Sequence, residues 1–175
     1  QDYWAYLPFN IATAYHFQLI GGHIAGTGLY SGPSFIYLMA IPAKIFSGNP
    51  LGFGYTVAAI GVLGTALIYR FAKDMFGKTA GIFSAIIHSG SFLVAIYDRE
   101  YWNASLIPIL SLITMWLVWK ISLGKVKYVI FLAFVLTLAF HAHGTGMALI
   151  VFTIISWIAF KLPVRNKFVG LAIGL

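Results

Sequence analysis

The chain has 175 residues, of which 61% are hydrophobic and 9% are charged, and its mean hydropathy is +0.90. A soluble domain needs about a quarter to a third of its surface residues to be charged, and eleven basic and four acidic residues are too few for that. The composition therefore excludes a soluble domain, and the net charge of +7 does not indicate nucleic-acid binding because the bases form no continuous run.

Nine of the eleven basic residues fall in three short segments, namely Arg70, Lys73 and Lys78, then Lys120, Lys125 and Lys127, then Lys161, Arg165 and Lys167. Three of the four acids, Asp2, Asp98 and Glu100, lie elsewhere. Basic residues collect in cytoplasmic loops of membrane proteins. The pattern predicts an integral, multi-pass membrane protein (in the plasma membrane if the organism is prokaryotic) whose chemistry lies on the extracytoplasmic face.

The first fifty residues are predicted to lie on that outer face. An aromatic stretch around Asp2 leads into an apolar helix, and a glycine-rich stretch at 21–28 is typical of a flexible linker. Pro33 suits the first position of the next helix. The apolar stretch 33–46 is too short for an ordinary span and is predicted to lie along the membrane surface. The alternative, in which it spans and residues 1–32 lie inside, fits the same charge pattern.

The remaining residues predict a bundle of transmembrane helices. A span needs about 20 mostly apolar residues, and the candidates are 51–69, 79–97, 103–119, 128–140 extended through His143, and 145–160. Gly144 and Gly146 predict the break between the last two. The predicted fold is an all-α polytopic transmembrane helix bundle with interfacial juxtamembrane helices on the outer face, divided into residues 1–50 and 51–175. The chain is expected to be part of a longer protein that extends beyond both ends.

The densest polar cluster is YDREYWN at 97–103. Tyr101 and Trp102 fit an ordinary aromatic belt at the membrane interface, whereas the triplet from Asp98 to Glu100 indicates a functional or network role. Asn103 is interpreted as a helix N-cap.

His141 and His143 follow an apolar helix. Residues at i and i+2 do not share a helical face, so a continuous helix would make a poor metal site. In a broken helix either imidazole is able to ligate a metal or to donate to a phosphate. His88 lies in the middle of a predicted span, where an ionisable group is a functional hypothesis.

Four stretches in this order resemble the GT-C superfamily of integral-membrane glycosyltransferases, in the branch of protein O-mannosyltransferases and aminoarabinose transferases. They are YSGPSFIYLMA at 30–40, YRFAKDMFGKTAG at 69–81, YDREYWNAS at 97–105 and HAHGT at 141–145. Each is weak alone, but the four at this spacing are specific. The resemblance covers nearly the whole chain and implies a first outer loop with an acidic, aromatic juxtamembrane helix.

The resemblance implies transfer of a sugar from a polyprenyl-phosphate donor to an acceptor protein, lipid or glycan, with inversion by direct displacement. The family's catalytic carboxylate precedes the aromatic helix, so it corresponds to Asp2 or to an acid just upstream of Gln1; Asp98 and Glu100 are further candidates. Asp98 replaces a common Ser, and His141 replaces a common Gln. No cofactor is certain, although a divalent metal is compatible, and no metal ligand is assigned. The expected substrate-binding or phosphate-binding residues are Arg99, Lys44, Tyr30, Tyr37, Asn103, His141 and His143.

Two other classes remain open. A transporter is compatible with His88 and with the segments that glycine and proline interrupt. A non-catalytic membrane scaffold would lack the acid at the family's catalytic position.

Overall fold

The structure is a computed structural model, and it describes residues 2–14, 17–24 and 28–160. Helices dominate it, and the elements in chain order are α1 (Asp2–Ala14), β1 (His23–Ile24), β2 (Leu29–Tyr30), α2 (Ser34–Ile45), α3 (Pro50–Phe76), α4 (Lys78–Gly90), α5 (Phe92–Tyr97), the 3-10 turn η1 (Asn103–Leu106), α6 (Ile107–Ser122), α7 (Tyr128–Ala142), the 3-10 turn η2 (Gly144–Gly146) and α8 (Met147–Phe160). This confirms the prediction of an all-α membrane helix bundle.

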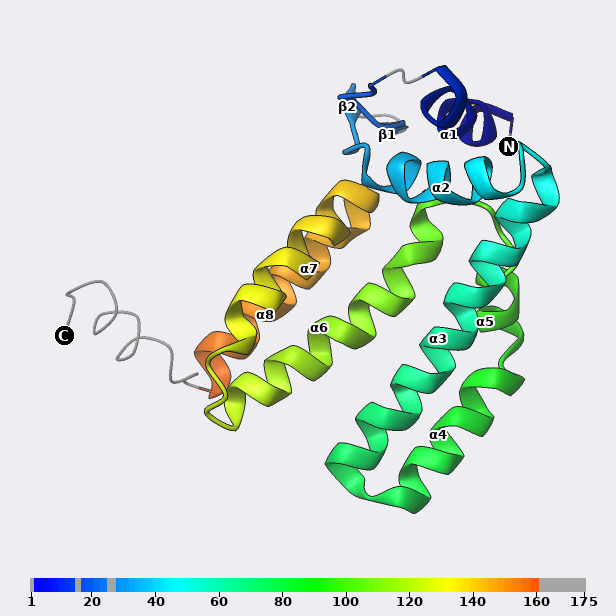
Figure 1. Cartoon of the computed structure of the whole chain (residues 1–175). Helices are drawn as coiled ribbons and strands as arrows, with labels where there is room; N and C mark the ends of the chain where they lie inside the picture. The colour runs from blue at the N-terminus through cyan, green and yellow to red at the C-terminus, as the bar shows by residue number, and fades with distance from the viewer. Residues whose placement is uncertain (1, 15–16, 25–27, 161–175) are drawn as a thin grey trace.

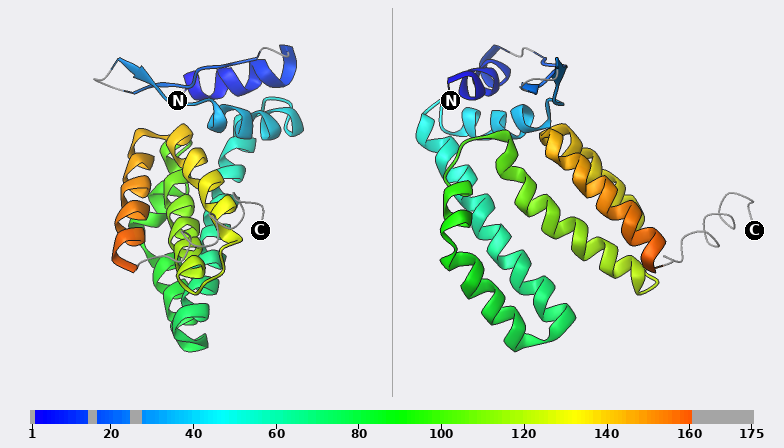
Figure 2. Two further views of the ribbon diagram at one scale, coloured as in Figure 1. Left: turned by 90° about the vertical axis from the view of Figure 1, so that its left-hand side faces the viewer. Right: turned by 180° about the vertical axis from the view of Figure 1, so that it is seen from behind.

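The long helices run side by side, and α1, the short β1–β2 ribbon and α2 cross one end of them (Figure 1). Seen from the side, α1 lies on α2, and α2 lies on the ends of the bundle (Figure 2). Phe35, Met39 and Ala43 of α2 form a buried cluster with Phe53 and Val57 of α3, which fixes this arrangement. We call this end of the molecule the capped end.

The start of α2 differs by one residue from the prediction. Pro33 is the N-cap, and the helix begins at Ser34. The Pro33 carbonyl accepts the first helical hydrogen bond from the Tyr37 N–H at 3.1 Å, as an N-cap carbonyl does. Proline loses nothing there, because its missing N–H has no helical partner at a helix start.

The stretch predicted as a flexible linker is partly ordered. β1 pairs antiparallel with β2, with His23 opposite Tyr30. Two backbone hydrogen bonds of 2.8 Å, from Gly21 N–H to Ser31 and from Ser31 N–H to Gly22, extend the pairing. Residues 21–24 are therefore paired in a ribbon and do not form the predicted flexible linker.

Among the described residues, two helices are long and apolar enough to cross a membrane by length and composition, Pro50–Phe76 and Asn103–Ser122. The 27 residues of α3 extend about 40 Å. The predicted span 79–97 is broken at Ser91, whose extended backbone (φ −75°, ψ 120°) separates α4 from α5. Helices Tyr128–Ala142 and Gly144–Phe160 are apolar but shorter.

The α6–α7 hairpin has its own core. Leu117 and Ile121 of α6 pack with Leu132 and Val135 of α7. Helix α7 ends at Ala142 rather than continuing through His143, which adopts an extended backbone with φ −157°. Gly146 permits the turn, because a Cβ there would overlap the Ala139 carbonyl. The break was thus predicted at the right place.

Large apolar side chains remain on the outside of the long helices. Val62, Ile130 and Ile158 are each at least 70% exposed. Soluble monomers rarely expose a large apolar surface of this kind, whereas in a membrane lipid or further helices would cover it. The exposed surface is therefore that of a membrane helix bundle.

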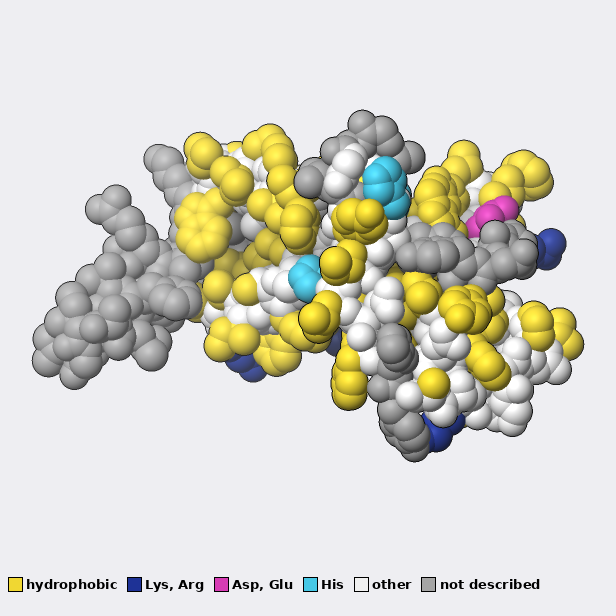
Figure 3. Space-filling view, turned by 90° about the horizontal axis from the view of Figure 1, so that it is seen from above, with side chains coloured by type: hydrophobic (Ala, Val, Ile, Leu, Met, Phe, Trp, Pro, Cys, Tyr) yellow, Lys and Arg dark blue, Asp and Glu magenta, His cyan; other side chains and the backbone are white. Residues whose placement is uncertain are grey.

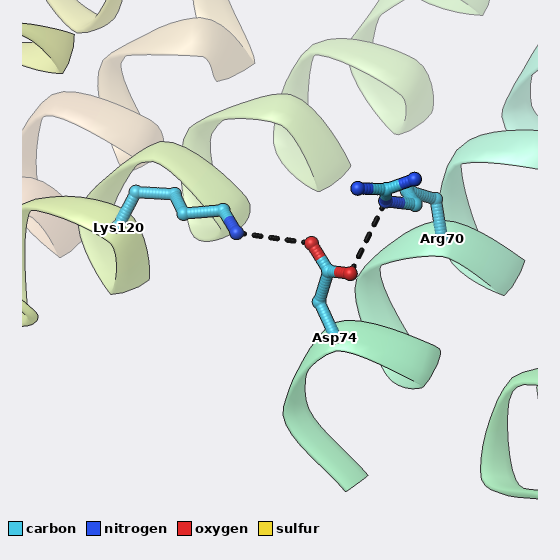
Figure 4. Close-up of polar contacts among 3 residues, drawn as sticks. All are labelled: Arg70, Asp74 and Lys120. Carbon is cyan, nitrogen blue, oxygen red and sulfur yellow. Dashed lines mark hydrogen bonds and ion pairs between the residues drawn. The ribbon is translucent and has the colours of Figure 1, made fainter. Parts of the chain in front are cut away.

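Within the described residues, the end opposite the cap carries most of the basic side chains, whereas Lys44 and Arg99 lie at the capped end. Lys73 and Lys120 lie in the last turns of α3 and α6. Asp74 joins these helices by accepting from Lys120 Nζ at 3.0 Å and from Arg70 Nε at 3.1 Å (Figure 4). The charge pattern seen along the chain thus becomes a difference between the two ends of one bundle.

Candidate functional site

The segment that follows α5 and runs into the 3-10 turn η1, which we call the polar loop (residues 98–105), is fixed by its own hydrogen bonds. Ser105 Oγ donates to the Glu100 carbonyl at 2.6 Å, and the Trp102 N–H donates to the same carbonyl at 3.0 Å. The Ser105 N–H donates in turn to the Trp102 carbonyl at 3.0 Å. The loop therefore holds its side chains in defined directions although it has no regular secondary structure.

Tyr101 anchors the polar loop to the cap. Its ring centroid lies 4.8 Å from that of Phe53 in α3 and 5.6 Å from that of Phe35 in α2. Burial raises the pKa of the Tyr101 phenol, because desolvation disfavours the phenolate. With Tyr101 turned inward, the neighbouring Glu100 and Trp102 are exposed.

Asp98 is half-buried, whereas Arg99 and Glu100 are exposed. Its carboxyl group packs against Gly61 of α3, where a Cβ would overlap it. Asp98 and His88 line a cavity of about 180 Å³ beside the break between α4 and α5. Burial raises the pKa of Asp98, and the nearby charge of His88 opposes that shift. The triplet from Asp98 to Glu100 is therefore split between the interior and the surface.

His88 is held by α3. Its Nδ1 lies 3.1 Å from Thr65 Oγ1, and that hydroxyl lies 3.3 Å from the Gly61 carbonyl. Gly61 leaves the space that the Asp98 carboxyl group occupies, whereas a Cβ at Gly64 would make only an ordinary contact with His88, at 3.7 Å. Small residues on a membrane helix let neighbouring groups approach its backbone closely, but Gly61 and Gly64 are three positions apart and do not form the GxxxG spacing that a sequence search would recognise.

Asn103 is not the N-cap of the following helix. Trp102 takes that position, and Asn103 is the first residue of η1. The buried Asn103 amide instead donates from Nδ2 to the Ala142 carbonyl at 2.6 Å. A helix end leaves its last carbonyls without intrahelical partners, so this bond satisfies one of the α7 carbonyls.

His143 continues the junction between the polar loop and α7. Its Nδ1 accepts from the Thr145 N–H at 3.3 Å and lies 2.9 Å from Thr145 Oγ1. Its ring meets the Trp102 ring edge-on, with centroids 5.4 Å apart. The ring of His141 lies against Gly32, beside the β2–α2 connection. The two histidines thus face different neighbours.

The three remaining predicted substrate residues lie in the cap. The Tyr37 hydroxyl donates to the Gln18 carbonyl at 3.0 Å and accepts from the Gln18 N–H at 3.1 Å. Tyr30 is 59% exposed and stacks edge-on with His23 at 5.3 Å. Lys44 is exposed in the last turn of α2.

Asp2 is the first residue of α1, and its side chain lies outside the described part of the structure. Within the described residues, no group of three or more His, Asp or Glu side chains is arranged to hold a metal ion. In the view from above, hydrophobic side chains are prominent among the described residues, and histidine, acidic and basic side chains are visible between them (Figure 3).

A sequence profile of the family described as dolichyl-phosphate-mannose-protein mannosyltransferase matches residues 31–175. The match includes α2, the polar loop and both histidines of the α7–α8 junction. The chain belongs to this mannosyltransferase family. No curated protein and no solved structure gives a significant match.

Membership of the mannosyltransferase family confirms the resemblance to GT-C enzymes. The protein is a membrane glycosyltransferase of the GT-C kind. In this mannosyltransferase-family protein, the polar loop at the capped end presents exposed carboxylate, guanidinium and indole groups beside the half-buried imidazole of His143. The cavity lined by Asp98 and His88 is separate from these groups, although Asp98 belongs to the same polar loop.

Proposed function

We propose that the protein crosses the bilayer several times and transfers a sugar from a polyprenyl-phosphate donor to an acceptor hydroxyl on the extracytoplasmic side. The family match supports sugar transfer. The observation that carries the rest is the position of Arg99, Glu100 and His143 at the capped end, away from the basic end with Lys73 and Lys120. Basic ends of membrane helices favour the cytoplasm, so the capped end faces outward in this proposal.

The proposed reaction is a direct displacement. A carboxylate takes the proton of the acceptor hydroxyl while the hydroxyl oxygen bonds to the anomeric carbon. The bond from that carbon to the phosphate oxygen breaks, and polyprenyl phosphate leaves with the electron pair. One displacement inverts the anomeric carbon. Asp2 is the first candidate for the base, and the exposed Glu100 is the second; Asp98, packed on Gly61, would first have to turn outward.

The leaving phosphate needs stabilisation of its charge. Arg99 is the first candidate because its planar guanidinium can bind phosphate through two donors. Lys44 and His143 are further candidates. Tyr30 and His141 are proposed to contact the substrate, and Tyr37 and Asn103 are proposed to position the site through the backbone carbonyls that they bind.

The test uses the full protein in proteoliposomes with radiolabelled polyprenyl-phosphate mannose as the probe. Peptide, glycolipid and saccharide acceptors are offered in parallel. We expect labelled product of inverted configuration, formed only when the acceptor is on the side of the capped end. Arg99→Ala should lower turnover by roughly a hundredfold, whereas Lys125→Ala, exposed at the other end, should leave it unchanged.

Absence of transfer from this donor and from other polyprenyl-phosphate sugars would overturn the proposal. The broken α4–α5 segment, with Asp98 and His88 beside it, favours a transporter as the second candidate. That alternative predicts uptake of labelled substrate into vesicles without covalent transfer. A scaffold predicts neither transfer nor uptake.

A further inference from the structure

Besides the Asp98 cavity, a further hollow lies at the polar loop and the end of α5. It has a volume of about 330 Å³ and is lined by Ile96, Tyr97, Glu100 and Trp102. Sites for small molecules begin at roughly 300 Å³. The hollow therefore has room for a small ligand but not for a folded polypeptide.

The aromatic walls of the hollow are held in place while part of each ring stays open. Trp102 is 40% exposed and Tyr97 is 36% exposed. His143 packs edge-on against the indole of Trp102, and Thr145 fixes His143 through Nδ1. Since Nδ1 accepts a hydrogen bond, neutral His143 carries its proton on Nε2 and is a donor. An aromatic surface supported by these contacts, next to a hydrogen-bond donor, is thus present without a ligand.

The chemistry of the walls selects among ligands. The Glu100 carboxylate only accepts hydrogen bonds, so it attracts hydroxyl groups and repels phosphates. An acyl chain would gain from the aromatic rings but would desolvate the carboxylate without a partner. A pyranose ring presents hydroxyls at its rim and polarised C–H groups on its face, and the electron-rich face of an aromatic ring attracts such C–H groups.

The hollow is also preorganised. Tyr101, between Phe35 and Phe53, anchors the loop from below. The Glu100 carbonyl is fixed by Ser105 Oγ at 2.6 Å. Ligand binding therefore costs little ordering of the protein.

We propose that the hollow of Ile96, Tyr97, Glu100 and Trp102 binds a pyranose ring, with its C–H face on Trp102 and a hydroxyl donating to Glu100. This rests on the proposed function, which supplies two sources of such a ring: the donor's sugar and a saccharide acceptor. In this proposal Trp102 determines affinity for the sugar, a role that differs from the interfacial-belt interpretation of its position.

The binding test is saturation-transfer NMR on the full protein in nanodiscs, with methyl mannopyranoside and methyl glucopyranoside as probes. We expect transfer to the ring C–H protons for the wild type and for Trp102→Phe, and its loss in Trp102→Ala. Phe76→Ala, a change of another exposed aromatic residue at the basic end, is the matched control and should retain the signal. Equal signals from Trp102→Ala and the wild type would overturn the proposal.

The kinetic test separates the two sources. Trp102→Ala should raise one KM about tenfold while kcat stays within about twofold. A rise in the KM for the polyprenyl-phosphate sugar assigns the hollow to the donor, and a rise in the KM for a saccharide acceptor assigns it to the acceptor. Unchanged values for both would refute the proposal.

Failure of the proposed function looks different. Sugar binding that depends on Trp102, without transfer from any donor, would remove the glycosyltransferase mechanism and leave the hollow as a sugar site. Sugar transfer without Trp102-dependent binding would refute the sugar site in the hollow and leave the glycosyltransferase mechanism in place. Thermal unfolding of each variant checks that it is folded.

Discussion

Asn103 Nδ2 donates a hydrogen bond of 2.6 Å to the carbonyl oxygen of Ala142, 39 residues away along the chain. This bond joins the start of the span that includes α6 to the end of α7. It also places Trp102 beside His143, and the centroids of these two rings lie 5.4 Å apart. The junction thus brings together two of the four stretches on which the family resemblance rests.

Asn103→Asp should destabilise the protein, because it replaces the donor by an acceptor that faces a carbonyl oxygen. Loss of a buried hydrogen bond that leaves one partner unsatisfied costs about 1–3 kcal/mol. The measurement is the apparent free energy of unfolding in mixed micelles. Thr137→Ala, which removes an exposed bond within α7, is the control and should cost much less. A loss no larger than that of the control would contradict the role given to this contact.

Gly61→Ala should destabilise the fold by about 1–3 kcal/mol, the usual cost of overpacking, because the new Cβ would overlap the Asp98 carboxyl group. Gly54→Ala in the same helix meets nothing within 4 Å and should be neutral or stabilising. Adding Asp98→Gly to Gly61→Ala should recover part of the loss, as a double-mutant cycle would measure. Additive losses would show that the two residues do not touch.

The stability of the protein should depend on pH through Asp98. Burial raises the pKa of Asp98 above its ordinary value of 3.8, so the folded state binds the proton more tightly than the unfolded state does. The resulting stabilisation is complete below pH 3.8 and is lost as pH rises through the folded pKa. The free energy of unfolding, measured across this pH range, should fall with rising pH in the wild type. We call this fall the pH slope, and Asp98→Asn should lack it.

Two further variants check that assignment. Glu100→Gln, at an exposed position, should retain the slope. His88→Gln should extend it to higher pH, because the charge of His88 lowers the pKa of Asp98. A slope that survives in Asp98→Asn would place the titrating group elsewhere.

At the basic end, Lys120→Met should cost more stability than Arg70→Met. The Lys120 side chain is 12% exposed and that of Arg70 is 62% exposed, although both contact Asp74 at about the same distance. An exposed ion pair contributes about 0–1 kcal/mol, whereas removing the buried partner leaves Asp74 poorly compensated. Lys120 also lies 4.5 Å from the centroid of the Trp119 ring. Equal losses in SDS unfolding would contradict the expected ranking.

The helix breaks show how far local patterns reach. Gly144 and Gly146 predicted the α7–α8 break, because glycine weakens a helix. Glycine alone does not decide the outcome, since α3 contains several glycines and is continuous. The break at Ser91 was missed, although Gly90 directly precedes it, because the long apolar run 79–97 was interpreted as one span. Likewise, Pro33 indicated the start of α2 to within one residue.

The sequence by itself determined the membrane class, the separation of basic from acidic segments and the family, because composition, run length and motif spacing are properties of the chain alone. Tertiary structure decided that Asp98 turns inward onto Gly61 while Glu100 and Trp102 face outward. The direction of a side chain in a non-helical loop has no period that a sequence can reveal. It is set by contacts with distant residues, here the burial of Tyr101 between Phe35 and Phe53.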